Sequence, residues 1–455
     1  MPLRHATSGL ATAEAEVVDL GARGTISTGI CFLDHMVDQL TAHAQLGVTL
    51  RLSLAEDAPQ DEASPPCKRR RELLPSQDYA AGSPARLHDR DIVAASGAAL
   101  GAALADVIAA ASCGHASPAV FCCPLDEAFS EATLELRPPA ERAGRCAVSL
   151  EPYGTFASSA AGRRWVGRFR TDLTPVFWQS LAVAMGVDLT LRRVRGANAH
   201  HVLEATFKAF ARALRAALDA AAAPCERMPC APPPAVEQSG AARRAQRQRT
   251  TKETRIEVWV NLDSPWCESD PLTTGVALLD RILLELVRAT NVKVGVRCEG
   301  DTHIDDHHTA EDVAITLGQC LHEALGDKTG LVRMGCAVGA HDAASCRAVL
   351  DLSNRPHFES NLLLDEEYVG GGVGDDAVCG HELSCEMLHH VFDSLTLEMR
   401  ATVHLEVLAD DGKPGHTLAI AIAAARAYGT SLSDAASVDP RRRGVVASSK
   451  GTLSK

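Results

Sequence analysis

The sequence lacks the features that mark several large classes of protein. It has no glycine-rich phosphate loop and no Gly-x-Gly-x-x-Gly turn, so it gives no support to a nucleotide-binding fold. No apolar stretch approaches twenty residues, which argues against a membrane span. The formal net charge is −13, so electrostatics do not favour nucleic-acid binding. We therefore expect neither a membrane nor a nucleic acid as a partner.

Paired cysteine motifs and a secretory leader are also missing. The fifteen cysteines are an odd number without metal-type spacing, so we expect reduced intracellular thiols. The first fourteen residues contain Arg4 as their one firm positive charge and no hydrophobic core of a signal peptide. We expect a cytoplasmic protein, with a short plastid presequence as the alternative.

Three potential metal ligands occur within five residues in the segment Asp301–Asp312. His307 and His308 can each lie near Glu311, because residues three and four apart share a helix face. The adjacent histidines diverge by about 100°, so they can serve two different metals. Two imidazoles and a carboxylate suit Zn²⁺, Mn²⁺ or Fe²⁺ better than Mg²⁺ or Ca²⁺. The segment predicts a metal site at the start of an apolar helix.

The same His-His-x-x-Glu spacing occurs again at His200, His201 and Glu204, before the apolar run 205–220. Taken singly, each run also fits a helix N-terminus whose acidic residue favours the helix dipole, with Glu204 and Lys208 as an ordinary ion pair. Two copies of one rare spacing make chance a poor explanation of both.

A resemblance to a known family rests on five segments: Thr28–Leu40 (TGICFLDHMVDQL), His200–Lys208 (HHVLEATFK), Gly300–Leu317 (GDTHIDDHHTAEDVAITL), Asp351–Pro356 (DLSNRP) and Ser448–Leu453 (SSKGTL). Together they resemble imidazoleglycerol-phosphate dehydratase, the manganese enzyme of histidine biosynthesis. The family's unit is less than half as long as this chain of 455 residues.

An internal repeat explains the length. Thr28–Met36 recurs as Thr274–Ile282, and His200–Glu204 recurs in degraded form as Gly415–Ala419. The sequence therefore predicts a tandem duplication, with copy one at residues 1–219 and copy two at residues 249–455. The resemblance implies an α+β fold in which each domain is a pseudo-repeat of sheet-plus-helix half-domains (ribosomal protein S5 domain 2-like).

Two segments are poor candidates for folded structure. Residues 56–85 contain Ser-Pro-Pro and the basic run Lys68–Arg71, and we expect a disordered insertion in copy one. An exposed charge cluster explains the basic run better than a nuclear signal does. Residues 220–248 are rich in alanine, proline and arginine, and we expect them to link the copies.

The resemblance implies eight metal-ligand positions, and the two copies divide them. Copy one keeps His35, His200, His201 and Glu204, and copy two keeps His307, His308, Glu311 and His390. Only one position has a ligand in both copies: it is His201 in copy one and His416 in copy two.

The missing ligands are replaced by residues that do not bind metals in this way. Copy one has Arg90 and Val176 at positions that copy two fills with Glu311 and His390. Copy two has Arg281 at the position of His35. It has Gly415 and Ala419 at the positions of His200 and Glu204. Because neither copy retains a full set, we expect a composite site that draws on both.

The expected substrate is a small-molecule phosphate. The resemblance assigns its binding to Gln39 and Lys208 of copy one and to Arg333, Arg355, Ser448 and Lys450 of copy two. Planar guanidinium groups bind phosphate oxygens bidentately. Taken by itself, Arg333 is equally well explained as a surface charge. We expect the tail Ser448–Leu453 to be a mobile loop that orders over bound substrate.

The resemblance makes Glu253 the candidate general base, with Glu204, His308 and Glu311 as the other expected catalytic groups. Manganese bound to the substrate's imidazole ring would supply a Lewis acid. We expect about two Mn²⁺ per chain, in one di-manganese site, and a large symmetric homo-oligomer.

Two other functions remain open. A non-catalytic structural or regulatory subunit of a dehydratase assembly would explain why each copy lacks some substrate contacts. Copy one has Ser117 and Pro139 in place of the arginines, and copy two has Glu285 and Ala423 in place of Gln39 and Lys208. A metal-dependent hydrolase could reuse the same ligands to hold a metal-activated water.

Overall fold

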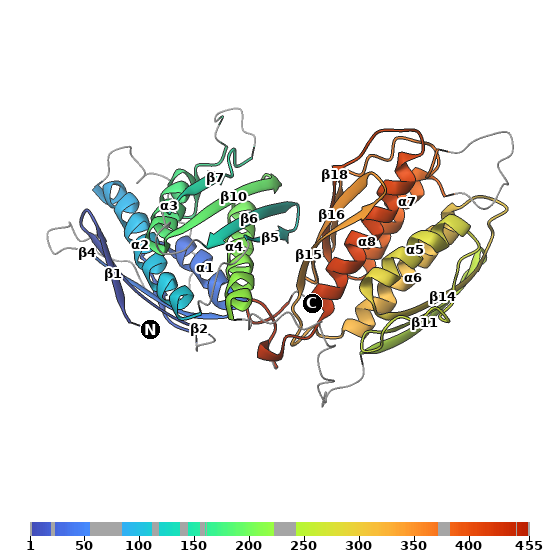
Figure 1. Cartoon of the computed structure of the whole chain (residues 1–455), viewed down its shortest axis with the longest axis horizontal. Coiled ribbons are helices and arrows are strands. Elements are labelled where there is room, and N and C mark those ends of the chain that lie inside the picture. The colour runs from blue at the N-terminus through green and yellow to red at the C-terminus, as the bar shows by residue number, and fades with distance from the viewer. Residues whose placement is uncertain are drawn as a thin grey trace, which may run out of the picture. The chain divides into compact units, whose positions relative to one another are not determined.

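The computed structural model describes residues 2–19, 23–54, 84–111, 118–136, 144–154, 160, 162–222, 243–371, 383–442 and 444–453. The chain divides into two units (Figure 1). Unit 1 comprises residues 1–122 and 128–226, and unit 2 comprises residues 123–127 and 227–455. All but the last two residues of the expected insertion 56–85 lie outside the described residues.

Unit 1 contains two half-domains with related series of elements. The first has β1 (Arg4–Ser8), β2 (Ala11–Asp19), β3 (Ile26–Ser27), α1 (Cys31–Gln39), the π-helical η1 (Leu40–Ala44), β4 (Leu46–Leu54) and α2 (Pro84–Ala111). The second has β5 (Ala119–Leu125), of which residues 123–125 fall in unit 2, followed by β6 (Ala128–Leu136), β7 (Cys146–Ser149), β8 (Trp165–Val166), β9 (Phe169–Arg170), η3 (Thr171–Leu173), α3 (Thr174–Met185), β10 (Val187–Arg195) and α4 (Ala199–Ala222).

Unit 2 repeats the same pattern. Its first half has β11 (Arg244–Thr250), β12 (Thr254–Asn261), β13 (Leu272–Thr273), α5 (Ala277–Thr290), β14 (Lys293–Gly300) and α6 (His307–Leu325). Its second half has β15 (Met334–His341), β16 (Ala344–Asp351), β17 (His357–Ser360), α7 (Cys385–Glu398), β18 (Thr402–Ala409), α8 (His416–Ala436) and η4 (Pro440–Arg442).

Every half-domain builds its sheet in the same order. The orders in the described chain are β1-β2-β4-β3, β5-β6-β10-β7, β11-β12-β14-β13 and β15-β16-β18-β17. The final pair of each sheet is parallel, and the helix between its two strands supplies the crossover that parallel pairing requires. This fourfold use of one topology confirms the expected α+β fold with sheet-plus-helix half-domains.

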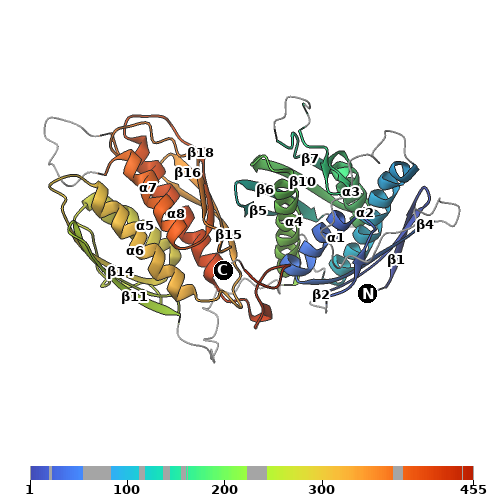
Figure 2. The ribbon, with the colours of Figure 1, turned by 180° about the vertical axis from the view of Figure 1, so that it is seen from behind.

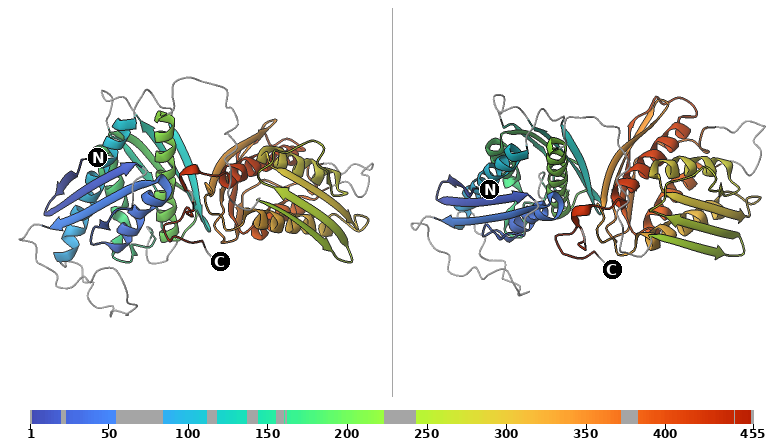
Figure 3. Two further views of the ribbon diagram at one scale, coloured as in Figure 1. Left: turned by 90° about the horizontal axis from the view of Figure 1, so that it is seen from below. Right: turned by 60° about the horizontal axis from the view of Figure 1, so that its bottom comes forward.

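The helices of each unit lie against the inner faces of its sheets (Figures 2 and 3). In β2, Ala11, Ala13, Ala15 and Val17 are fully buried while the residues between them are not. Such alternation is typical of a strand with one face on the core. In unit 2 a single buried cluster contains apolar residues of both sheets and of α5 to α8. Each unit therefore has its own core, and its long helices are part of that core.

Helix α2 corrects the expectation that no segment is apolar enough to span a membrane. Its portion His88–Ala111 passes a test of length and composition for such a span. However, 67% of its most apolar window is buried within the protein, as in the core helix of a folded domain.

The structure also corrects the ends of the expected insertion and linker. Pro84 and Ala85 begin α2, because proline is well tolerated in the first turn of a helix. Residues 220–222 extend α4, in keeping with the high helix propensity of alanine. Residues 244–248 belong to β11, which pairs with β12. Residues 223–242 of the expected linker lie outside the described residues, and Arg243 is the first described residue before β11.

Candidate metal centre and substrate site

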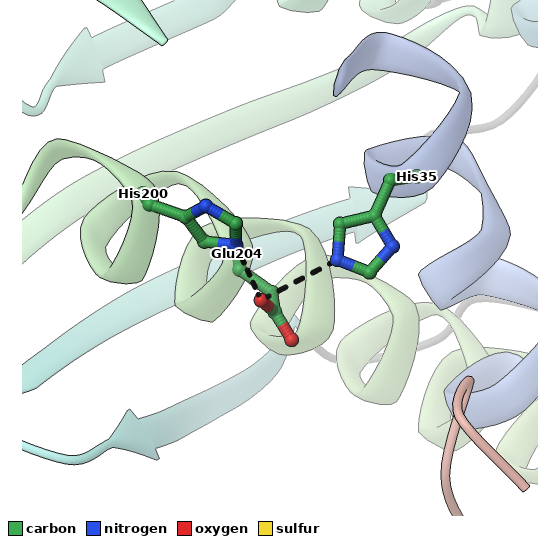
Figure 4. A group of neighbouring side chains, drawn as sticks. All are labelled: His35, His200 and Glu204. Carbon is green, nitrogen blue, oxygen red and sulfur yellow. Dashed lines mark hydrogen bonds and ion pairs between the residues drawn. The ribbon is translucent and has the colours of Figure 1, made fainter. Parts of the chain in front are cut away.

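Three of the expected metal ligands meet in unit 1. Nε2 of His35, on α1, lies 3.6 Å from Oε2 of Glu204, and Nε2 of His200 lies 3.1 Å from the same oxygen (Figure 4). One ligand atom from each residue lies within 4.8 Å of the others. Two imidazoles and a carboxylate at this spacing fit a divalent transition metal such as Mn²⁺. We call these residues the α1–α4 cluster.

Local hydrogen bonds place the two helices of this cluster. Asp34 in the first turn of α1 accepts hydrogen bonds from N and Oγ1 of Thr28, at 2.8 and 2.6 Å. Asn198 accepts a hydrogen bond of 3.0 Å from N of His200 at the start of α4. The ring of Phe32 lies edge-on to that of His200, with centroids 5.2 Å apart. The ends of α1 and α4 are thus fixed by residues next to the ligands.

The Glu204 carboxylate is buried, with 8% of its side chain exposed, beside the ammonium of Lys208 at 2.8 Å. Burial alone would raise the pKa of Glu204. The Lys208 charge and the hydrogen bonds from His200, His35 and Lys208 outweigh it and hold the pKa well below its usual value. Glu204 is therefore anionic at neutral pH, as a metal ligand must be.

Gln39, a predicted substrate contact, is fully buried one turn after His35 and donates a hydrogen bond of 3.1 Å to the backbone oxygen of His35. The helix then continues as the π-helical η1. Short π-helical segments often occur at functional sites. In unit 2, by contrast, α5 runs without such an interruption through the same region.

Unit 2 holds a second cluster between α6 and α7. Nε2 of His390 lies 2.9 Å from Oε1 of Glu311, and Nε2 of His307 lies 3.9 Å from Oε2 of that residue. The arrangement mirrors unit 1, because one histidine comes from the shorter helix and a His–Glu pair from the longer one. Asp305 accepts a hydrogen bond from N of His307 at 3.0 Å, as Asn198 does in α4. We call these residues the α6–α7 cluster.

His308 has different neighbours from His307, as expected for adjacent helical residues. Its Nδ1 lies 3.1 Å from Oδ2 of Asp301, and its Nε2 lies 3.9 Å from Oε1 of Glu253. The hydrogen bond with Asp301 is the main cause of the raised pKa of His308. Asp301 was not among the predicted site residues, although it opens the acidic segment that follows β14.

The turn between β11 and β12 brings Glu253 to this region. Oγ1 of Thr251 accepts hydrogen bonds from N of Glu253 and N of Thr254, at 3.1 and 2.9 Å. Thr254 in turn donates a hydrogen bond of 2.6 Å to Asp312 on α6. Glu253 is therefore tied to the helix that carries His308 and Glu311. The turn between β1 and β2 in unit 1 has Gly9 and Leu10, so it offers no carboxylate.

The α5–α8 face of unit 2 has a different construction from the α1–α4 face of unit 1. Glu285, at the position of Gln39, accepts a hydrogen bond of 2.7 Å from Nε of Arg426. At Gly429 an added Cβ would lie 2.2 Å from the backbone oxygen of Leu286, so α5 and α8 are in close contact. Arg281 is exposed at the position of His35.

Among the described residues, His416 makes its closest contacts with a carboxylate and a backbone oxygen rather than with another imidazole. Its Nε2 lies 3.1 Å from Oδ1 of Asp365, and its Nδ1 lies 2.9 Å from the backbone oxygen of Lys413. Burial lowers its pKa, but the Lys413 hydrogen bond and the charges of Asp410 and Asp365 leave it raised overall. His201, at the matching position of α4, has its ring 6.2 Å from that of His200.

The α2–α3 face of unit 1 likewise has no described ligand set. Val176 is half-buried on α3 at the position of His390, and Arg90 is exposed on α2 at the position of Glu311. The side chains of residues 86 and 87, at the positions of His307 and His308, lie outside the described part of the chain.

Arg333 is not a surface charge, so that explanation is wrong. It is 5% exposed, and its Nε and Nη2 donate hydrogen bonds of 2.7 Å to the two carboxylate oxygens of Asp351. Its Nη1 donates to the backbone oxygen of Ala447. Arg333 thus ties the end of β16 to the C-terminal segment, and a contact with substrate remains a prediction.

Three further predicted substrate contacts, Arg355, Ser448 and Lys450, lie in the same unit as Arg333. N of Arg355 donates to Oγ of Ser353 at 3.0 Å, and the backbone oxygen of Arg355 accepts from Thr402 at 2.9 Å, so the backbone is anchored while the side chain is 32% exposed. In the tail, Oγ of Ser448 accepts a hydrogen bond of 3.1 Å from N of Lys450. Lys208 belongs to unit 1, beside Glu204.

The family model for imidazoleglycerol-phosphate dehydratase matches residues 85–214 and 274–431 of this chain. The imidazoleglycerol-phosphate dehydratase of Microcystis aeruginosa is 39% identical over 212 residues, which cover 46% of this chain and 93% of the relative. The same enzyme of Halorhodospira halophila is 40% identical over 213 residues, 47% of this chain and 100% of the relative. Each alignment thus spans about half of this chain.

Two crystal structures of the family also match. The Staphylococcus aureus dehydratase is 26% identical, with a TM-score of 0.35, and the match covers 43% of this chain and 99% of the other. The Pyrococcus furiosus structure, a complex with (S)-C348, is 28% identical, with a TM-score of 0.35 and coverage of 46% and 100%. On the two family-model matches and the identity with the bacterial relatives, the predicted membership is confirmed: the chain belongs to the imidazoleglycerol-phosphate dehydratase family of hydro-lyases.

Proposed function

We propose that the chain catalyses the Mn²⁺-dependent dehydration of imidazoleglycerol phosphate to imidazole acetol phosphate in histidine biosynthesis. The observation that carries the proposal is the complementarity of the two units. Unit 1 has the α1–α4 cluster and unit 2 has the α6–α7 cluster. If the duplicated chain had lost its function, the two units would not be expected to retain complementary halves of one ligand set.

In this proposal the two clusters contribute to one di-manganese site per chain, within a large symmetric homo-oligomer that brings unlike units together. The second histidines, His201 and His308, suit such a site because each diverges from the ligand beside it on its helix. They could therefore bind a metal held mainly by the opposite cluster. The α5–α8 and α2–α3 faces would remain without metal.

The proposed reaction removes one water from neighbouring carbons of the substrate. Bound manganese would supply Lewis-acid stabilisation to the substrate's imidazole ring. Glu253 would take the proton from carbon C2 of the substrate, because its carboxylate lies beside His308 on a turn fixed to α6. The hydroxyl group of the neighbouring carbon would leave as hydroxide, which together with the proton taken by Glu253 makes up the one water lost, and the resulting enol would become the ketone.

Phosphate binding in this proposal uses cations of both units. Lys208 and Arg333 pair with Glu204 and Asp351 in this structure, so substrate would have to share or displace those partners. Arg355 has an anchored backbone and a partly exposed side chain, whose Nε lies 3.2 Å from Oδ1 of Asp126, and Lys450 is exposed in the tail. Ser448 and Gln39 would complete the polar contacts.

The buried pairs of Lys208 and Arg333 also favour a second candidate, a non-catalytic subunit that assembles with an active dehydratase. In such a protein these cations would stabilise the fold and need never contact phosphate. This alternative predicts Mn²⁺ binding without turnover by the purified chain.

The test is to incubate purified full-length protein with Mn²⁺ and imidazoleglycerol phosphate and to follow imidazole acetol phosphate. Turnover that disappears in both His35→Ala and His390→Ala would support a site that needs both clusters. Val176→Ala, on the α2–α3 face, is the matched control and should retain activity. Absence of turnover in the manganese-loaded wild-type protein would favour the non-catalytic subunit.

A further inference from the structure

Asp306, the N-cap residue of α6, does not cap its own helix. An N-cap aspartate usually accepts a hydrogen bond from a backbone N–H in the first turn. The Asp306 side chain makes no such bond. Its Oδ2 instead accepts two hydrogen bonds from Ser384, from N at 2.7 Å and from Oγ at 2.9 Å. A carboxylate that could stabilise one helix is thus used to join two.

Ser384 is itself the N-cap residue of α7. Its Oγ accepts a hydrogen bond from N of Met387 at 3.4 Å while donating to Asp306. The contact therefore joins the N-terminal end of α6 to the N-terminal end of α7. Both the backbone N–H and the hydroxyl group of Ser384 take part in it.

The joined ends carry the α6–α7 cluster. His307 follows Asp306 directly and Glu311 lies just over a turn further along α6, while His390 lies within two turns of Ser384 on α7. A shift of α7 along its axis by one residue would move His390 by about 1.5 Å relative to Glu311. Such a shift would disrupt the 2.9 Å contact between Nε2 of His390 and Oε1 of Glu311.

Two other helices of the described chain are held in a different way. The first turn of α5 is held by Asp280, which accepts hydrogen bonds of 2.7 Å from N and Oγ1 of Thr274. In α1, Asp34 and Thr28 make the same contacts. Those links join a helix to the turn that precedes it, whereas α7 is held by a residue of another ligand-bearing helix.

We propose that Asp306 is a positioning residue that fixes α7 on α6 and thereby sets the metal affinity of the α6–α7 cluster. The inference rests on the proposed manganese site, to which it adds a residue outside the eight ligand positions. Asp306 acts through Ser384 and needs no contact with the metal. Its loss should therefore weaken metal binding to the extent typical of residues that orient ligands, about 10–100-fold.

The link can be broken from either side. Asp306→Ala removes the acceptor. Ser384→Pro removes both donors but leaves the Asp306 carboxylate, and the Ser384 backbone, with φ −70° and ψ 148°, suits proline. In Mn²⁺ titrations of the full-length protein followed by electron paramagnetic resonance, each variant should weaken binding at one class of site by about 10–100-fold. The double variant should bind Mn²⁺ no more weakly than the single variant that has the lower Mn²⁺ affinity.

Two further variants separate positioning from general stability. Asp280→Ala breaks the comparable link at α5, so it should lower the melting temperature with Mn²⁺ affinity unchanged. Asp306→Asn keeps an oxygen acceptor and should keep most of the affinity, which provides a folded variant if Asp306→Ala does not fold.

Unchanged Mn²⁺ affinity in Asp306→Ala, or an equal loss in Asp280→Ala, would overturn the inference. Weak binding in Asp306→Ala with normal binding in Ser384→Pro would also overturn it, because Asp306 would then act on the metal directly. Wild-type protein that binds no Mn²⁺ would instead overturn the metal site of the proposed function, and with it the role of Asp306.

Discussion

Nε2 of His390 lies 2.9 Å from Oε1 of Glu311, between helices from different half-domains of unit 2. The equivalent half-domain interface of unit 1 has Val176 and Arg90 in place of these two residues. The opposite interface shows the reverse, because unit 1 keeps His35 and unit 2 has Arg281. Each unit has thus kept one of two pseudo-symmetric clusters.

Removal of one ligand from either cluster should weaken manganese binding and activity together. We expect His35→Ala and His390→Ala each to lower kcat by at least about 100-fold, because loss of a ligand costs at least as much as loss of a residue that orients one. The measurement is steady-state turnover beside elemental analysis of dialysed protein. A variant of either type that retained full activity would show that its cluster is dispensable.

Arg333 and Asp351 should behave as a buried ion pair. Arg333→Ala leaves an uncompensated carboxylate, so it should lower the free energy of unfolding by about 3–5 kcal/mol. The double variant Arg333→Ala/Asp351→Ala should lose less than the two single variants combined. Urea unfolding of the three proteins tests this. Strictly additive losses would mean that the two residues do not stabilise each other.

Gly429 should be required for the close contact of α5 with α8. Gly429→Ala places a Cβ against the Leu286 carbonyl and should destabilise unit 2 by about 1–3 kcal/mol through overpacking. Mn²⁺ affinity should not change, because this face carries no proposed ligand. Thermal unfolding and an Mn²⁺ titration of the same sample provide the two readouts. A loss of metal with no loss of stability would contradict the assignment of this face.

The depressed pKa of Glu204 predicts how metal-free protein responds to acid. A carboxyl whose pKa is lowered by folding stabilises the protein above its unfolded pKa, about 4.3 for glutamate, and this contribution is lost as pH falls toward the folded value. Wild-type stability should therefore fall more steeply below about pH 4.3 than that of Glu204→Gln. Equal slopes in chemical unfolding at a series of pH values would argue against a depressed pKa.

The sequence predicted the contacts that depend on helical spacing. His200 and Glu204, like His307 and Glu311, are four residues apart, so a helix alone brings them together. The internal repeat also indicated which positions had lost their ligands. The sequence did not predict the partners of Asp301 and Asp306, because their contacts depend on how separate helices and turns pack. Arg333 was misjudged as a possible surface charge for the same reason, since its burial depends on Asp351 and the C-terminal segment.

If the two incomplete units share one set of ligands, they provide one di-manganese site per chain. Elemental analysis of dialysed full-length protein, after saturation with Mn²⁺, tests this most directly. We expect about two manganese ions per chain, with fewer in His35→Ala and in His390→Ala. A value near four would mean that the α2–α3 and α5–α8 faces also bind metal, and would contradict the division of labour between the units.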